Sequence, residues 1–132
     1  MTRGETKIVD QVRAMIASGS HAEAALLCEE HLRAAPIEAT AHILEGLMLS
    51  IQGRQNDAIA AYDTALAFDP GALAAYLGIA EILAEKGWLS SAVVVMENAR
   101  DATDFTSEAQ GALDELRTRL AQISQASGRE KL

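Results

Sequence analysis

The side chains best suited to metal binding in this sequence are three histidines, His21, His31 and His42. Two ligands on one helix usually stand four residues apart, whereas these histidines are ten and eleven residues apart. We therefore interpret them as structural or exposed residues and expect no metal ion and no cofactor. Cys28 is the single cysteine, so it cannot form an internal disulfide. Because no basic side chain neighbours it in sequence, we expect its thiol to have low reactivity.

Catalytic motifs are missing from the sequence. It contains no glycine-rich phosphate loop, no nucleophile elbow and no helix with a His-Glu metal motif. The acidic residues are scattered at spacings typical of a solvated helical face. We therefore predict no catalytic residues and expect that the protein is not an enzyme.

The composition favours helices and an uncharged or basic partner. Apolar residues make up 49% of the chain but aromatic residues only 4%, a mixture that suits closely packed helices better than strands. The net charge is −8, and residues 35–104 carry ten acidic side chains against three basic ones. Nucleic acid is excluded as a partner because phosphate binding needs clustered Lys and Arg.

We also expect a cytoplasmic protein, since we find neither a signal peptide nor an apolar run long enough for membrane insertion.

Several residue types recur at a step of 34 residues, which is the period of helix-turn-helix repeats. A glycine that ends one helix is followed five residues later by an alanine that lets the next helix pack closely. Proline then marks the exit from the hairpin, because it cannot continue a helix. The series are Gly19, Gly53 and Gly87; Ala24, Ala58 and Ala92; and Pro36 and Pro70.

The apolar spacing predicts an all-α protein of antiparallel helical hairpins with about seven helices, and we expect these hairpins to stack as a right-handed solenoid. We expect one domain over residues 1–126, followed by a polar tail, 127–132. Its repeats would cover about 5–38, 39–72 and 73–106, and a capping box from Ser107 to Gln110 would open a capping helix over about 107–126. The six hairpin helices are expected near Glu5–Ser18, Ala22–Ala34, Glu38–Gln52, Gln55–Ala67, Ala72–Lys86 and Leu89–Ala102.

The middle copy resembles a tetratricopeptide repeat, with Gly46, Gly53, Ala58, Tyr62, Ala65 and Pro70 in the family's order and spacing. The third copy keeps Tyr76, Ala80, Gly87, Ala92 and Ala99, whereas the first departs from the pattern at Val12, Cys28 and His31. The resemblance implies protein binding in a concave groove lined by the first helix of each hairpin.

Transferring this groove by repeat position gives three rows with the spacing i, i+4, i+7, which lie on one stripe of each helix. They form an aliphatic trough with a cation, Arg13, at one end and an anion, Glu81, at the other. The alternative is that the apolar members are simply hairpin core. A clamp for a C-terminal carboxylate is disfavoured, because such clamps carry Lys, Arg and Asn on these stripes. The predicted groove residues are Val9, Arg13 and Ile16; Ile43, Leu47 and Ser50; and Leu77, Glu81 and Ala84.

We therefore hypothesise a bacterial-type adaptor or chaperone that binds an apolar or amphipathic segment of a partner protein, similar to the small tetratricopeptide chaperones of type III secretion. The alternative is a structural module that forms homo-oligomers through its first helix or through the apolar run Val93–Met96. Trp88 is expected to pack within a hairpin, whereas an exposed ring would mark a second contact surface.

Overall fold

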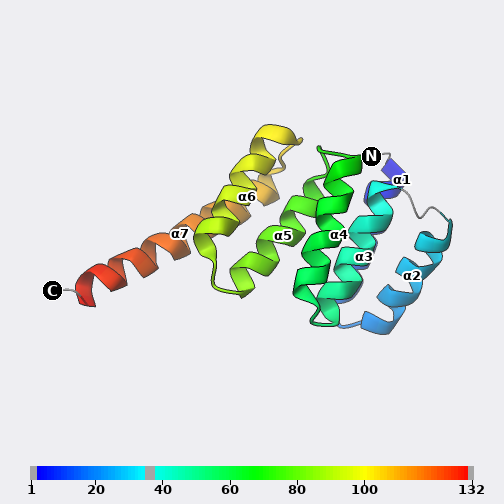
Figure 1. Cartoon of the computed structure of the whole chain (residues 1–132), viewed down its shortest axis with the longest axis horizontal. Coiled ribbons are helices and arrows are strands. Elements are labelled where there is room, and N and C mark those ends of the chain that lie inside the picture. The colour runs from blue at the N-terminus through cyan, green and yellow to red at the C-terminus, as the bar shows by residue number, and fades with distance from the viewer. Residues whose placement is uncertain (1–2, 35–37, 131–132) are drawn as a thin grey trace.

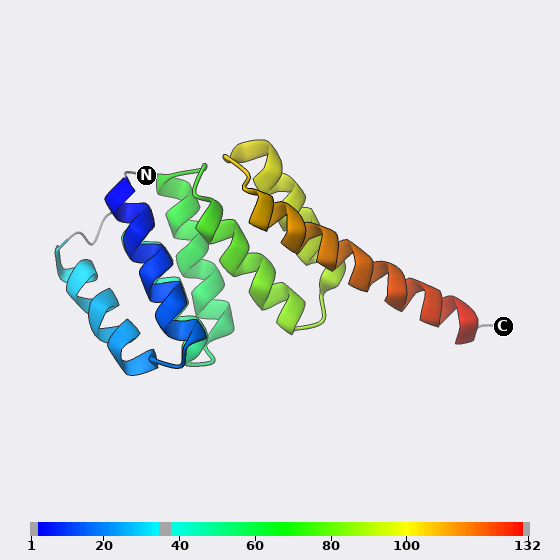
Figure 2. The same cartoon turned by 180° about the vertical axis from the view of Figure 1, so that it is seen from behind.

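The computed structural model describes residues 3–34 and 38–130, and these form an all-α solenoid of antiparallel hairpins, as predicted. Figures 1 and 2 show two layers: α2, α4 and α6 lie on one face, and α1, α3, α5 and α7 lie on the other. The first helices α1, α3 and α5 are neighbours in this order, and α7 packs on α6. The helices are α1 (Arg3–Ala17), α2 (His21–Ala34), α3 (Ala39–Ile51), α4 (Gln55–Phe68), α5 (Leu73–Glu85), α6 (Leu89–Ala102) and α7 (Ser107–Glu130).

Each hairpin turns at the glycine that the repeat predicted. Gly19, Gly53 and Gly87 have φ angles of 84°, 77° and 81°, a left-handed conformation that favours glycine. In each turn the amide of the next residue donates back to a carbonyl five residues earlier, at 2.8 to 2.9 Å. This closing bond satisfies a free carbonyl at the helix end, and it recurs unchanged at 34-residue intervals.

The connections between hairpins were predicted at two prolines. Pro70 lies between α4 and α5, where it was expected, and its carbonyl accepts a 3.2 Å hydrogen bond from the Tyr76 hydroxyl. Pro36 lies outside the described residues.

The predicted capping box at Ser107 is off by one residue. The Thr106 hydroxyl accepts a 3.1 Å hydrogen bond from the Ala109 amide, so Thr106 caps α7 and Ser107 is its first helical residue. Both hydroxyl residues suit a cap, and which one takes the role depends on where the chain leaves α6.

The last helix continues the period instead of only closing the stack. The helices α3, α5 and α7 begin at residues 39, 73 and 107, which are 34 residues apart. α7 therefore stands where the first helix of a fourth hairpin would stand. It also runs on to Glu130, so residues 127–130 of the expected tail are helical, while 131 and 132 lie outside the described residues. Gly128 disfavours a helix by only about 1 kcal/mol relative to alanine, which does not suffice to end one.

In the hairpin core, a large side chain on one helix packs against small residues on the two neighbouring helices. Tyr62 is 1% exposed, and a Cβ atom added to Gly46 or Gly78 would come within 3.0 Å of its ring. The ring therefore fills the space that two missing side chains leave between α3 and α5. One repeat later, the smaller Met96 shares a cluster with Ala80 and Ala112. One repeat earlier, the still smaller Cys28 shares a cluster with Val12 and Leu44.

Candidate functional site

The predicted trough is partly filled by the protein's own core. Val9 and Ile43 are 2% and 1% exposed and belong to the main core cluster, so for these two residues the core alternative is correct. Both are the first position of their i, i+4, i+7 stripe and turn toward the hairpin core, whereas Leu77, the first position of the third stripe, is only partly buried. Leu47 is 7% exposed and reaches the surface only at its edge.

The predicted cation and anion meet rather than mark opposite ends of a trough. The guanidinium of Arg13 on α1 lies 2.6 Å from a carboxylate oxygen of Glu81 on α5, and this ion pair bridges the two helices on either side of α3. First helices that are two repeats apart thus lie within reach of one ion pair. We therefore correct the prediction of separated charges.

Beneath this ion pair lies a small hollow of about 220 Å³, which we call the α1–α5 cavity. Its walls combine the paired charges with aliphatic side chains from α1 and α3. Four residues line it that belong to the predicted set, and Ala17 is an addition. The lining residues are Arg13, Ile16, Ala17, Leu47 and Glu81.

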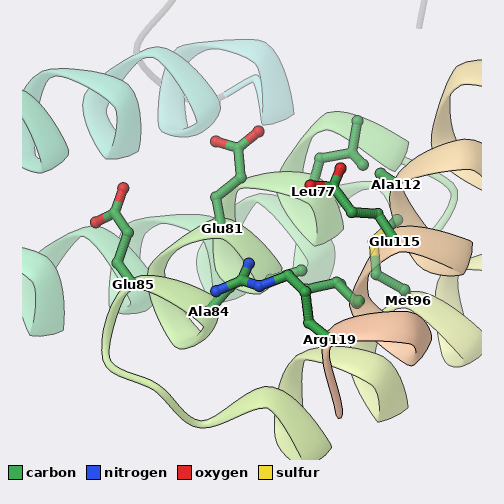
Figure 3. Close-up of a pocket in the computed structure, with 10 residues that line it drawn as sticks. Leu77, Glu81, Ala84, Glu85, Met96, Ala112, Glu115 and Arg119 are labelled. Carbon is green, nitrogen blue, oxygen red and sulfur yellow. The ribbon is translucent and has the colours of Figure 1, made fainter. Parts of the chain in front are cut away.

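A second hollow of about 370 Å³, the α5–α7 cavity, lies between α5 and the last helix (Figure 3). Its apolar surface comes from α5, α6 and α7, and charged side chains border it. Figure 3 shows Arg119 reaching from α7 toward Ala84, with Glu81 and Glu85 projecting from α5. The lining residues are Leu77, Ala80, Glu81, Ala84, Glu85, Met96, Ala112, Glu115, Leu116 and Arg119.

The sequence interpretation missed the contribution of α7 to this cavity. It predicted α7 only as a capping helix, although Ala109 stands 34 residues after Ala75, and both are buried. That step was the available signal that α7 takes a first-helix position. Its side chains Ala112, Glu115 and Leu116 accordingly face the hollow beside α5.

The remaining predicted residue, Ser50, is half-buried and belongs to neither cavity. Its side chain hydrogen-bonds with that of Tyr62. Burial is the main cause that raises the pKa of Tyr62 to about 12, so the phenol is neutral at physiological pH. Ser50 thus contacts the core ring and lines neither of the two cavities.

Trp88 does not pack inside a hairpin, because its ring is 56% exposed. The ammonium of Lys86 lies 5.1 Å from the ring centroid, a distance suited to a cation–π contact. Leu120 and Ile123 of α7 share a shallow hollow of about 310 Å³ with this ring. Trp88 follows the turn glycine directly, at a position where earlier repeats have Ser20 and Arg54, so it projects outward.

Cys28 and His42, two of the residues considered for metal binding or reactivity, pack against other parts of the protein. Cys28 is fully buried, and burial together with Glu29 raises the pKa of its thiol to about 11. His42 stacks on Phe68 with ring centroids 5.4 Å apart. Within residues 3–34 and 38–130, no three His, Cys, Asp or Glu side chains gather to hold a metal ion, and no helix is long and apolar enough to cross a membrane.

The stacked hairpins, whose first helices border apolar hollows, define this protein as a helical-repeat protein. Two solved structures of the Yersinia enterocolitica type III secretion chaperone SycD are similar to it. The first, described as a translocator chaperone, has a TM-score of 0.64 at 16% identity, over 93% of this chain and 85% of that one. The second, in complex with a peptide of the translocator YopD, has a TM-score of 0.57 at 18% identity, over 100% and 98%.

At these identities the likeness shows a shared fold. No protein-family model matches the sequence, and no curated protein is similar to it in sequence.

Proposed function

We propose that this protein is a tetratricopeptide-type binding module that acts as an adaptor or chaperone and holds an apolar or amphipathic segment of a partner protein. The segment would lie along the layer of first helices, with its apolar side chains in the α1–α5 and α5–α7 cavities. We further propose that it works in the cytoplasm and catalyses no reaction.

The observation that carries the proposal is the α5–α7 cavity. Its volume of about 370 Å³ suits one or two apolar side chains, and it opens on the layer that a groove-binding repeat protein uses. Leu77 and Ala84 are only partly buried there, which leaves apolar surface for a partner to cover. Support also comes from SycD, which has a similar fold and has been crystallised with a peptide of the translocator YopD.

Selection from a phage-displayed library of random 12-residue peptides tests the proposal. We expect peptides with spaced apolar residues to bind the wild-type protein and to lose binding to Ala84→Arg, whose long side chain would occupy the cavity. Ala67→Arg is the matched control, because Ala67 is exposed on α4 and lines neither cavity. Circular dichroism checks that both variants fold. Equal binding of the selected peptides to Ala84→Arg would contradict the proposal, as would a selection that yields no binders.

Self-association is the second candidate function. It is favoured by the exposure of Val94 on α6, at 54%, within the apolar run Val93–Met96. Leu26 stands two repeat steps earlier on α2 and is 60% exposed. Light scattering over a hundredfold range of concentration tests this: a mass that stays at one chain contradicts self-association, and a dimer that Val94→Lys dissociates supports it.

A further inference from the structure

We infer that the α5–α7 cavity is a specificity subsite for an apolar side chain that has a lysine or arginine next to it in the partner's sequence. The inference rests on the proposed function and deepens it by naming the chemistry of the bound segment. Two observations carry it: the apolar floor of the cavity and the unequal charges at its border.

The floor of the cavity is apolar, so it accepts an apolar side chain but has no hydrogen-bond partner for a polar one. Met96 and Ala80 are 1% and 3% exposed at its base, and Leu116 from α7 is 8% exposed. Leu77 and Ala112 stand partly buried at the sides. A guest that buried a polar group here would lose its hydrogen bonds to water without replacement, so an aliphatic or aromatic side chain is the favoured occupant.

The border carries three carboxylates and one cation. Glu81, Glu85 and Glu115 line the cavity together with Arg119, and the chain between residues 35 and 104 adds to the negative field. Glu81 is already engaged by Arg13. Within the described residues, neither Glu115 nor Glu85 forms an ion pair, and Glu85 accepts a 2.9 Å hydrogen bond from the neutral amide of Gln55.

The positions of these two carboxylates define where the cation of the guest would stand. Glu85 belongs to α5 and Glu115 to α7, so they lie on different walls of the cavity (Figure 3). An apolar side chain inserted between the helices therefore has a carboxylate on each side of its backbone. Lysine or arginine beside the anchor can reach one of them while its stem covers the rim.

The test compares selected peptides between the wild-type protein and the double variant Glu85→Gln/Glu115→Gln. The matched control is Glu29→Gln/Glu30→Gln on α2, which removes the same net charge from exposed positions away from both cavities. On the wild-type protein and on the control, we expect lysine and arginine to be enriched beside an apolar residue. On the cavity variant we expect this enrichment to disappear while apolar residues remain selected.

A double-mutant cycle gives the magnitude. Replacing the flanking lysine of a selected peptide by glutamine should weaken binding to the wild-type protein by about threefold, as for an exposed ion pair, and should have no effect on the cavity variant. Fluorescence anisotropy measures both affinities, and the difference should shrink in 1 M salt. Amide chemical shifts of Ala84 and Ala112 locate the peptide.

The outcomes separate the inference from the proposed function. Peptides selected without basic enrichment, an equal lysine effect in the cavity variant, or shift changes confined to the α1–α5 cavity would overturn the subsite and leave the groove standing. A library that yields no binder would overturn the proposed function itself.

Discussion

Replacing Gly78 by alanine tests the packing that sets the distance between α3 and α5. The change favours a helix interior by about 1 kcal/mol, so an exposed glycine would gain stability from it. At Gly78, however, the new Cβ atom would come within 3.0 Å of the Tyr62 ring, whereas an ordinary contact is 3.4–4 Å. The ring has little room to move away, because Gly46 on α3 lies so near it that a Cβ atom added there would also meet the ring, at 2.6 Å.

Overpacking of this kind typically costs about 1–3 kcal/mol, so the net loss for Gly78→Ala should be roughly 1 to 2 kcal/mol after the helical gain. Urea denaturation followed by circular dichroism measures it. Gly111→Ala is the matched control, because its Cβ atom meets nothing within 4 Å, and it should stabilise the protein by up to about 1 kcal/mol.

The third hairpin supplies a rescue, since it combines Met96 with Ala80 and Ala112. In a Tyr62→Met background the smaller side chain should make Gly78→Ala neutral or favourable. If Gly78→Ala alone is as stable as Gly111→Ala, the packing of the Tyr62 ring against the glycines does not set the distance between α3 and α5.

Three further perturbations have defined outcomes. The side chains of Arg13 and Glu81 are 31% and 55% exposed, so their ion pair should be weak. A double-mutant cycle of Arg13→Ala and Glu81→Ala should give a coupling energy of about 0.2–1 kcal/mol that falls in 1 M salt. Zero coupling at low salt would contradict a bridge between α1 and α5. Thr106→Ala should lower the free energy of unfolding by about 1 kcal/mol and Ser107→Ala by far less, whereas the reverse order in thermal melts would restore Ser107 as the cap. The pKa of the Cys28 thiol is about 11 in the folded chain against 9.0 when unfolded. The contribution of this thiol to stability should therefore be full below pH 9, and the free energy of unfolding should fall by up to about 1.4 kcal/mol per pH unit from pH 9 to 11. Urea melts of Cys28→Ala should show a smaller fall over this range, and an equal fall would assign the effect to another group.

Six of the predicted groove residues border a cavity, because the helical repeat places them on the first helices. Arg13, Ile16, Leu47, Leu77, Glu81 and Ala84 all line one of the two cavities. Val9 and Ile43 do not, because a 34-residue period assigns a position within a hairpin but not the direction from which the next hairpin covers it. Burial depends on neighbours that are distant in sequence, so Val9 and Ile43 could not be separated from the core by their spacing.

The surfaces made by α7 and Trp88 illustrate the same limit. The helix that carries Glu115 and Arg119 was predicted only as a capping helix, since the spacing of these side chains does not show that α5 stands opposite. Trp88 was expected to pack within a hairpin, yet it directly follows the left-handed glycine turn and is exposed.

By itself, the sequence determined the all-α fold, the hairpin turns at Gly19, Gly53 and Gly87, and the acidic character of the central repeats. These properties follow from local conformational preference, apolar periodicity and a sum of charges, all of which act within one hairpin or need no coordinates. The tertiary structure decided which side chains stay open to a partner, that Arg13 and Glu81 meet, and that α7 forms a wall of the larger cavity. Each of these depends on how the hairpins pack on one another, because that packing decides which side chains from different repeats are covered and which of them meet.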